Sequence, residues 1–345
     1  MQDNKESLIG MDLAQLTEVV KGGGMPGFVA KQIAQWIYEK RATDFSEMVN
    51  ISKRNREWLE ENYRIGRRKP VKSVESTDGT VKYLFDADGR TIESVYIPDK
   101  DRATLCVSSQ KGCRMNCYFC ATGKGGYHGN LTCAQIINQI LEIPPKGSGM
   151  QELTNVVFMG MGEPLDNFHE VEKAINILTS PWGFAWSPKR ITVSTVGKLP
   201  ELKDLLDRTQ VHLAVSVHTA VPHERESMMP AERAFSLSSV IHLLHGYDFA
   251  HQRRLSFEYI MWRNVNDDIA HAEALAKLIG RLPVRVNLIR FHKIPGVELH
   301  PSSEEKMLIF RNYLNSKGIL CTIRASRGED IAAACGMLAG KRENC

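Results

Sequence analysis

Between residues 105 and 324, short apolar runs alternate with longer amphipathic stretches, and this alternation most narrows the choice of folds. The stretches between most of the runs carry apolar residues at helical spacing, as in Ala134–Ile143, Glu170–Leu178, Leu237–Tyr247, Ile269–Ile279 and Ser303–Ser316. The runs themselves have the length of β-strands: Leu105–Ser108, Asn155–Met159, Ile191–Thr195, His212–Val217, Leu255–Met261, Val284–Phe291 and Thr322–Arg324. Repeated βα units of this kind indicate a parallel sheet or barrel. About six units follow the first run. We therefore predict an α/β fold, a partial (βα)6 TIM-like barrel with its active residues at the carboxyl ends of the strands.

Two smaller parts precede the predicted barrel. Up to about Gly66 the pattern is helical, with no strand-like run and with expected helices at 11–20, 28–38 and 53–62. These helices would form a compact module of helix-hairpin-helix character. Val81–Phe85 and Thr91–Ile97 flank Asp86–Gly89, which predicts a β-hairpin with a glycine turn. We expect a helical accessory domain at 1–70, a hairpin linker at 71–98 and the barrel at 99–340.

Composition excludes some classes of protein. There is no run of eighteen apolar residues, so no membrane span is expected. The polar start, Met1–Glu6, lacks the apolar core of a signal peptide, and we expect a cytoplasmic protein. In that compartment thiols stay reduced, and metal or catalytic use of cysteine is the default.

Net charge points only weakly to a partner, because 44 basic residues are nearly balanced by 40 acidic ones. A local cluster says more. Five basic residues fall within nine positions and could neutralise phosphates, although a solvated basic linker explains them equally well: Arg64, Arg67, Arg68, Lys69 and Lys72.

Cys113, Cys117 and Cys120 have the spacing C-x3-C-x2-C in the loop after the first predicted strand. Three thiolates can hold three corners of a [4Fe–4S] cluster and leave one iron open for chemistry. A zinc knuckle is the alternative, and it would need a fourth ligand such as His128. A disulfide is disfavoured, since three clustered cysteines cannot pair off.

Further polar residues follow the next strands. In Met159–Pro164 the glycines would let the backbone approach a ligand closely, and Glu163 offers an acceptor for an ammonium group. Ser194 lies at the end of one strand and Ser216-Val217-His218 at the end of another. Their hydroxyls and imidazole could bind a ribose or a carboxylate, or could simply cap the strands.

Cys106 and Cys335 are each unremarkable, because a buried free cysteine behaves as a small hydrophobe. Together with the cysteine loop and the Gly-Glu motif, however, they resemble the RlmN/Cfr family of radical S-adenosylmethionine (SAM) RNA methyltransferases. The resemblance runs along nearly the whole chain, in Arg102–Gln110, the cysteine loop through Leu131, Met159–Asn167, Ile191–Gly197, Val284–Gly296 and Arg324–Gly340.

The resemblance implies a radical SAM core and an RNA-binding role for the helical accessory domain. It also implies a [4Fe–4S] cluster on Cys113, Cys117 and Cys120, and two SAM molecules per turnover. The SAM contacts carried over are Gly162, Glu163, Ser194, Ser216, Val217, His218 and His292. At His292 the family usually has Asn, whose single hydrogen bond an imidazole can still make.

The resemblance implies a mechanism as well. Adenine C2 is an electron-poor carbon that attacks a SAM methyl group poorly, so the first SAM methylates Cys335 instead. The second SAM gives a 5′-deoxyadenosyl radical, which takes hydrogen from that methyl group, and the carbon radical adds to C2. Glu93 matches the base that removes the C2 proton, although by pattern alone it is a hairpin residue expected to face solvent. Cys106 then attacks Cys335, which releases the product and forms a transient disulfide.

Substrates and partners are implied in the same way. The dual-specificity members methylate adenine C2 in 23S rRNA near the peptidyl transferase centre and in certain tRNAs beside the anticodon. We expect a flavodoxin or ferredoxin as electron donor, a monomer, and no membrane partner. Three cysteines match no family role and are interpreted as structural or exposed thiols: Cys133, Cys321 and Cys345. His128 and His212 are interpreted as structural.

Two alternatives stay open. Methylation at adenosine C8 of 23S rRNA uses the same chemistry, and Pro164 after Glu163 favours C2 over C8 only weakly. A non-catalytic zinc- or cluster-holding RNA-binding protein would need a fourth fixed ligand and would give Cys335 no role.

Overall fold

A computed structural model describes residues 5–144, 149–251 and 253–340. Its centre is a ten-stranded sheet in the order β14-β13-β12-β11-β10-β9-β6-β5-β4-β3. Seven of these strands run parallel, and the two edge strands do not pair with each other within the described chain. The parallel strands are β6 (Arg102–Cys106), β9 (Leu153–Phe158), β10 (Ile191–Thr195), β11 (His212–Ser216), β12 (Leu255–Met261), β13 (Arg285–Arg290) and β14 (Cys321–Ile323). The predicted partial barrel is confirmed, with six strands after the cysteine motif.

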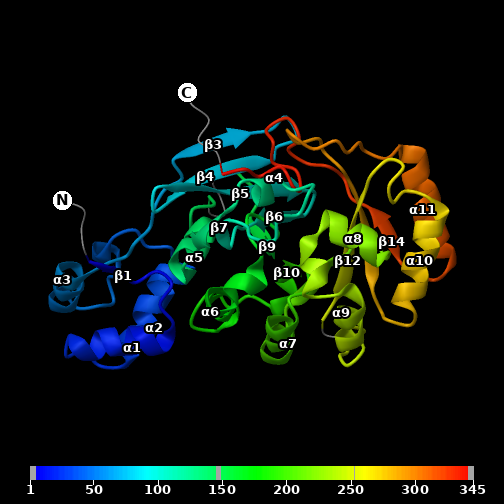
Figure 1. Cartoon of the computed structure of the whole chain (residues 1–345). Helices are drawn as coiled ribbons and strands as arrows, with labels where there is room; N and C mark the ends of the chain where they lie inside the picture. The colour runs from blue at the N-terminus through cyan, green and yellow to red at the C-terminus, as the bar shows by residue number, and fades with distance from the viewer. Residues whose placement is uncertain (1–4, 145–148, 252, 341–345) are drawn as a thin grey trace.

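Helices line the outer side of the curved sheet, from α5 at one end to α11 at the other (Figure 1). Each buries an apolar stripe: in α6, for example, Val171, Ala174, Ile175 and Leu178 are buried. The connecting helices are α5 (Cys133–Leu141), α6 (Phe168–Thr179), α7 (Leu199–Arg208), α8 (Pro222–Met228), α9 (Leu237–Leu244), α10 (Ile269–Ile279) and α11 (Glu304–Ser316).

The hairpin extends the sheet beyond β6. Strands β4 (Val81–Ala87) and β5 (Arg90–Asp99) are antiparallel, and β5 pairs antiparallel with β6. Asp88 and Gly89, the two residues between β4 and β5, both have positive φ, which is the backbone conformation of a type I′ turn. A third strand that the pattern did not predict, β3 (Lys72–Glu75), pairs with β4.

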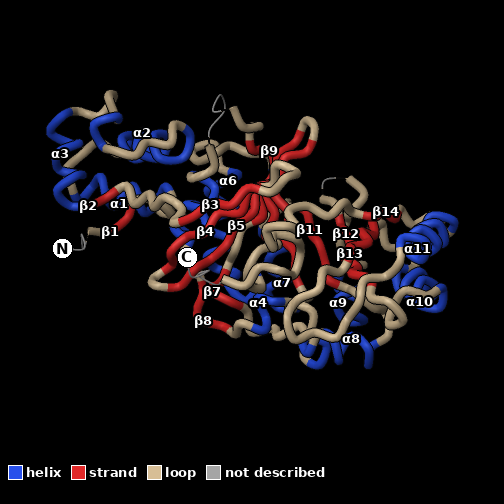
Figure 2. Tube along the Cα trace, turned by 90° about the horizontal axis from the view of Figure 1, so that it is seen from above, coloured by secondary structure: helices blue, strands red, loops and turns tan. Residues whose placement is uncertain are grey.

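The N-terminal helices are α1 (Leu13–Gly22), α2 (Phe28–Ala34) and α3 (Lys53–Asn62), and a π-helical turn at Gln35–Glu39 follows α2. They lie together at one end of the molecule (Figures 1 and 2). The expectation that this region has no strand is wrong, because β1 (Glu6–Ser7) pairs in parallel with β2 (Tyr63–Arg64). The chain enters and leaves the module side by side there, and two-residue strands carry no periodic signal.

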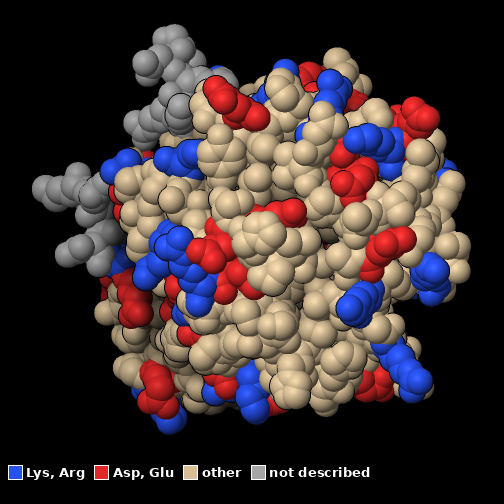
Figure 3. Space-filling model, turned by 45° about the vertical axis from the view of Figure 1, so that its right-hand side comes forward, with Lys and Arg blue, Asp and Glu red and all other residues tan. Residues whose placement is uncertain are grey.

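Buried apolar side chains form one large core and one small cluster. The small cluster comprises Phe119, Val196, Met229, Ala231, Ile260, Trp262, Phe291 and Leu299. Val196, Trp262 and Phe291 directly follow the carboxyl ends of β10, β12 and β13. Within the described ranges no helix is both long and apolar enough to cross a membrane. On the face in Figure 3, Lys and Arg side chains lie among Asp and Glu.

Candidate active site

The cysteine loop is closed at its base by a small two-stranded sheet. Strand β7 (Gln110–Gly112) pairs antiparallel with β8 (Tyr127–Asn130), and the Cys113 N–H donates to the Gly126 carbonyl oxygen at 3.0 Å. Cys120 immediately precedes the one-turn helix α4 (Ala121–Lys124). The loop is therefore fixed at both ends.

Packing and one ion pair hold the loop against the barrel. The Phe119 ring is buried, with its centroid 4.8 Å from that of His218 and 5.0 Å from that of Trp262. Arg114 Nε lies 2.8 Å from a carboxylate oxygen of Asp166, whose side chain is buried. The aromatic residue before the third cysteine thus anchors the loop in the small apolar cluster.

The three thiols act on one another. Burial raises the pKa of Cys113 to about 12 and raises that of Cys117 well above its ordinary value. Burial is the largest cause of the raised Cys117 pKa, and the neighbouring thiols of Cys120 and then Cys113 raise it further. Thiolate ligands of iron are deprotonated by the metal charge, which would relieve this cost. Three thiols on one fixed loop are the donors that hold three corners of a [4Fe–4S] cluster, although in this structure they are not gathered at ligand distance.

No group of three or more His, Cys, Asp or Glu side chains in the described chain is gathered closely enough to hold a metal ion. His128, the fourth ligand that a zinc knuckle would need, is exposed, and its Nε2 lies 3.0 Å from the Gly125 carbonyl oxygen.

The Gly-Glu motif forms the turn after β9 and packs on the residues after β6. Gly162 has φ +102°, and a Cβ built there would lie 2.5 Å from Cβ of Gln110, so only glycine fits. The two Glu163 carboxylate oxygens accept hydrogen bonds from Leu165 N–H at 3.1 Å and Val196 N–H at 2.9 Å. Burial raises the pKa of Glu163 to about 7. Glu163 therefore joins the ends of β9 and β10, whatever else it binds.

The other predicted SAM contacts lie on or after β10 and β11. Ser194 is half-buried near the end of β10, and Ser216 is the half-buried last residue of β11. Val217 is fully buried, and its N–H donates to the Glu258 carbonyl oxygen at 3.0 Å. These positions lie at the strand ends where the fold predicts a ligand.

His218 is a packed, neutral residue. Its Nδ1 accepts a hydrogen bond from Ile260 N–H at 3.1 Å. Burial and then Arg225 lower the pKa of the imidazole to about 3. The ring packs against Phe119 and Trp262, so the structure gives it a part in supporting the cysteine loop.

His292 follows β13 and faces the C-terminal segment. Its Nε2 lies 3.0 Å from Ser326 Oγ and its Nδ1 lies 3.2 Å from a carboxylate oxygen of Glu329. Both ring nitrogens are thus engaged by the segment that leads to Cys335. A contact of His292 with SAM would have to replace one of these two partners.

Cys106 and Cys335 are brought together although 228 residues lie between them in the chain. Burial raises the pKa of Cys106 to about 12, and the second largest contribution to this rise comes from Cys335. Cys335 is open to solvent, yet the surrounding protein desolvates its thiol enough to raise the pKa. Cys120 is a smaller cause of that shift. Cys335 lies beside the cysteine loop, because Ala121 N–H donates to the carbonyl oxygen of Gly336, the residue after Cys335, at 2.8 Å.

Glu93 is buried, not solvent-facing as its hairpin position alone would suggest. One carboxylate oxygen accepts a hydrogen bond from Gly340 N–H at 3.0 Å, and the other lies 4.0 Å from Lys82 Nζ. The C-terminal segment covers it: Ala121 N–H donates to the Gly336 carbonyl oxygen at 2.8 Å in the same region. In Figure 1 this segment crosses above β4, β5 and α4.

Sequence reasoning missed two charged groups of the site. Arg324, directly after β14, lowers the pKa of Cys106 and of Cys335, and it lies 3.6 Å from a buried Glu258 oxygen. Arg225 is fully buried, pairs with Glu232, and donates to carbonyl oxygens at the ends of β10 and β11. No motif marks either residue.

Several other predicted residues serve the fold. In the basic cluster, Arg67 donates to Glu142 and to the carbonyl oxygens of Arg41 and Leu141. Cys133 and Cys321 are buried thiols, as their structural interpretation predicted. Cys345 lies outside the described residues.

The chain is similar to known proteins along nearly its whole length. Residues 6–65 match the model of the ribosomal RNA large subunit methyltransferase N-terminal domain, and residues 107–276 match that of the radical SAM superfamily. A probable dual-specificity RNA methyltransferase RlmN of Parabacteroides distasonis is 57% identical over 97% of each chain. Its counterpart in Bacteroides thetaiotaomicron is 54% identical over 99% of this chain and 98% of the relative.

A solved structure has the same fold. The crystal structure of a radical SAM methyltransferase from Sphaerobacter thermophilus aligns with a TM-score of 0.91 at 37% identity, over 97% of this chain and all of that one. The chain belongs to the RlmN family of dual-specificity RNA methyltransferases, within the radical SAM superfamily.

Proposed function

We propose that this enzyme methylates C2 of adenosine in 23S rRNA, near the peptidyl transferase centre, and in tRNA beside the anticodon. The observation that carries the proposal is the docking of the Cys335 segment on the cysteine loop, where Ala121 N–H donates to the Gly336 carbonyl oxygen at 2.8 Å and the Cys106 thiol is influenced by Cys335; a reaction that passes through sulfur needs two such thiols in reach. The printed name of its relatives, dual-specificity RNA methyltransferase, supports the two RNA substrates.

In this proposal Cys113, Cys117 and Cys120 hold the [4Fe–4S] cluster. The turn at Gly162 and Glu163, with Ser194, Ser216, Val217 and His218, would hold SAM. When bound, the cluster and SAM supply a methyl group and a hydrogen-abstracting radical. His292 is included as a further SAM contact, for which its ring must give up Ser326 or Glu329.

The chain's own residues then have separate tasks. Cys335 receives the methyl group on sulfur and carries it to the base. Burial raises the pKa of this thiol, and Arg324 offsets part of that rise. Glu93, held by Gly340, receives the proton from C2. Cys106 forms a disulfide with Cys335, which frees the methylated base. An external thiol must reduce that disulfide before the next turnover.

The proposal assigns RNA contact to residues 1–70, a hairpin linker to 71–98 and the chemistry to 99–340. The match of residues 6–65 to the rRNA methyltransferase N-terminal domain supports the first part. The proposed function also includes a cytoplasmic location, a monomeric state, the absence of a membrane partner and an electron donor of the flavodoxin or ferredoxin type. The target adenosine must leave its stack to reach Cys335.

The test is nucleoside analysis after reaction of anaerobically reconstituted protein with rRNA and tRNA. We expect iron–sulfide absorption, 5′-deoxyadenosine and 2-methyladenosine, the last identified by mass spectrometry against authentic standards. Cys335→Ala should keep the absorption and lose the product. Cys106→Ala should leave RNA attached to the protein, because nothing releases it. The matched control, Cys321→Ala, removes a buried thiol that lies elsewhere.

Each other outcome selects an alternative. Detection of 8-methyladenosine would favour the C8 reaction. Zinc in place of iron, together with unmodified RNA, would favour the non-catalytic RNA-binding protein.

A further inference from the structure

A recess of about 620 Å³ lies at the amino ends of the parallel strands, opposite the end that carries the thiols. Its wall includes residues that open or closely precede strands, namely Lys189 before β10, His212 at the start of β11, Arg254 before β12, Arg285 at the start of β13 and Leu320 before β14. Because the barrel is partial, these ends are not closed into a ring, and the recess stays open to solvent.

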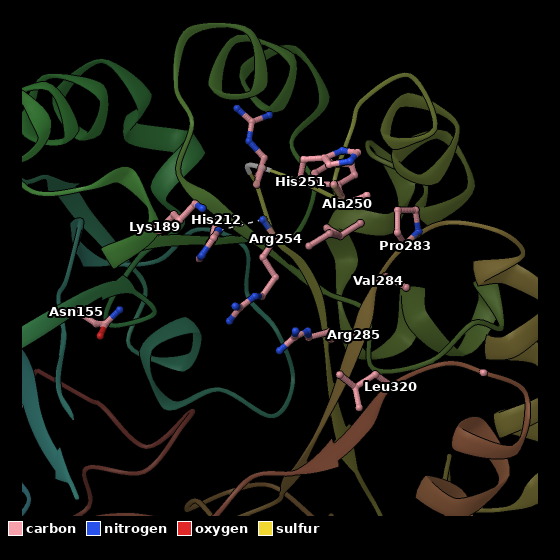
Figure 4. A pocket seen from close by; sticks show the side chains of 14 residues that line it. Asn155, Lys189, His212, Ala250, His251, Arg254, Pro283, Val284, Arg285 and Leu320 are labelled. Carbon is pink, nitrogen blue, oxygen red and sulfur yellow. Dashed lines mark hydrogen bonds between the residues drawn. The ribbon is translucent and has the colours of Figure 1, made fainter. Parts of the chain in front are cut away.

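The recess is lined by positive charge without acidic compensation. Lys189, Arg254 and Arg285 are exposed side chains on its wall, and no Asp or Glu is among its described lining residues. Within the described chain none of these three has a carboxylate within ion-pair distance. In Figure 4 the side chains of Arg254 and Arg285 extend toward the same space, with Lys189 and His212 beside it.

His212 gives the recess a further hydrogen-bond donor, and Arg253 adds a buried positive charge to its wall. The Arg254 backbone N–H donates to His212 Nδ1 at 3.0 Å, which leaves the imidazole proton on Nε2. Burial, followed by the charges of Arg254 and Lys189, lowers the pKa of His212 to about 4, so the ring is a neutral donor at pH 7. Arg253, buried in the wall, donates through Nη2 to the carbonyl oxygens of Leu206 and Thr209. Its Nε is buried with no hydrogen-bond partner among the described residues.

The fold does not need this arrangement. Like charges gathered at one site repel one another and destabilise the folded chain. The nearby acids are occupied elsewhere: Asp248 lies 2.8 Å from His251, and Asp207 binds Lys203 and Tyr247. A bound anion would remove the repulsion.

We propose that this recess binds phosphate groups. A guanidinium group can donate two parallel hydrogen bonds to two oxygens of one phosphate. A multiply charged phosphate also neutralises three positive charges better than a single carboxylate does. The volume is in the range of ligand pockets and exceeds what one inorganic ion needs. The phosphates can belong to an RNA backbone or to a free phosphorylated molecule, and both share this chemistry.

The test uses the full chain and two probes, inorganic pyrophosphate and a labelled RNA hairpin, with calorimetry for the first and fluorescence anisotropy for the second. Arg254→Gln/Arg285→Gln removes two recess charges. Lys277→Gln/Arg311→Gln removes the same net charge from helices α10 and α11 and is the matched control. Arg254→Lys/Arg285→Lys keeps the charge but loses the two-point geometry.

We expect pyrophosphate to bind the wild type and the control, and the Gln pair to weaken it by about a hundredfold, roughly tenfold for each charge-assisted hydrogen bond lost. The affinity of the Arg254→Lys/Arg285→Lys variant for pyrophosphate should lie between those of the wild type and the Gln pair. If RNA supplies the phosphates, the Gln pair also lowers RNA affinity and reduces the slope of log K against log salt by roughly two. If a free phosphorylated molecule does, RNA binding is unchanged. Pyrophosphate binding that is absent, or equal in the Gln pair and the control, overturns the proposal. Neither readout depends on methylation.

Discussion

The pH dependence of stability should report the burial of Glu163. Burial raises the pKa of this carboxyl to about 7, from an ordinary value of 4.5. Below pH 4.5 the folded and unfolded chains are both protonated at this position, and stability does not depend on it. Between pH 4.5 and 7 the unfolded chain releases the proton while the folded chain keeps it, so stability falls as pH rises. The shift of about 2.5 pKa units corresponds to a loss of about 3 kcal/mol by pH 8.

Glu163→Gln removes this titration. The amide cannot accept from both Leu165 N–H and Val196 N–H, so we expect the variant to be less stable than wild type at pH 5. That offset does not change with pH. The difference between wild type and variant should therefore shift in favour of the variant by about 2.5 kcal/mol between pH 5 and pH 8, because part of the loss has already occurred by pH 5.

The assay is urea unfolding of the metal-free protein at pH 5, 6, 7 and 8, analysed as the difference between the two chains. Glu305→Gln, which replaces an exposed carboxylate in the first turn of α11, is the control and should leave the pH dependence as in wild type. A wild type and Glu163→Gln whose stabilities run parallel over this range would refute the reasoning, because Glu163 would then ionise as readily folded as unfolded.

Three further changes have direct expectations. Phe119→Ala should cost about 3–5 kcal/mol in urea unfolding and lower iron content after reconstitution, because the ring anchors the cysteine loop. Arg225→Met should cost a similar ~3–5 kcal/mol, since it leaves Glu232 buried without its cation, and a double change with Glu232→Gln should recover part of the loss. Arg324→Met should raise the pKa of the Cys335 thiol and slow its alkylation by iodoacetamide at pH 8, measured by peptide mass spectrometry; an unchanged rate would contradict the role given to the guanidinium.

The elements that the sequence predicted best are those with a long periodic pattern. Residues 53–62 and Ile191–Thr195 match α3 and β10 residue for residue. The elements missed are short and polar, such as β7, or two residues long, such as β1. A strand of two or three residues has no measurable period, and its pairing depends on where the rest of the chain lies.

The site divides in the same way. The spacing of the three cysteines was enough to identify the cysteine loop. The order of the βα units then predicted that this loop lies at the carboxyl end of a strand. The burial of Glu93 could not be predicted, because Gly340, which covers it, lies 247 positions away. The partners of His292 were hidden for the same reason. Residues whose role rests on a contact across the fold carry no local signal.

The two ends of the parallel strands have different chemistry, and strand length limits how they can influence each other. Strand β12 has seven residues, so Arg254 before it and Trp262 after it are separated by roughly 20 Å or more along the strand. Charges at that distance are largely screened in salt solution. The recess therefore cannot tune the thiols or touch the reacting adenine. A phosphate group bound in the recess can therefore hold a long RNA in place or belong to a separate phosphorylated molecule. In both cases the methyl transfer takes place at the opposite end of the strands.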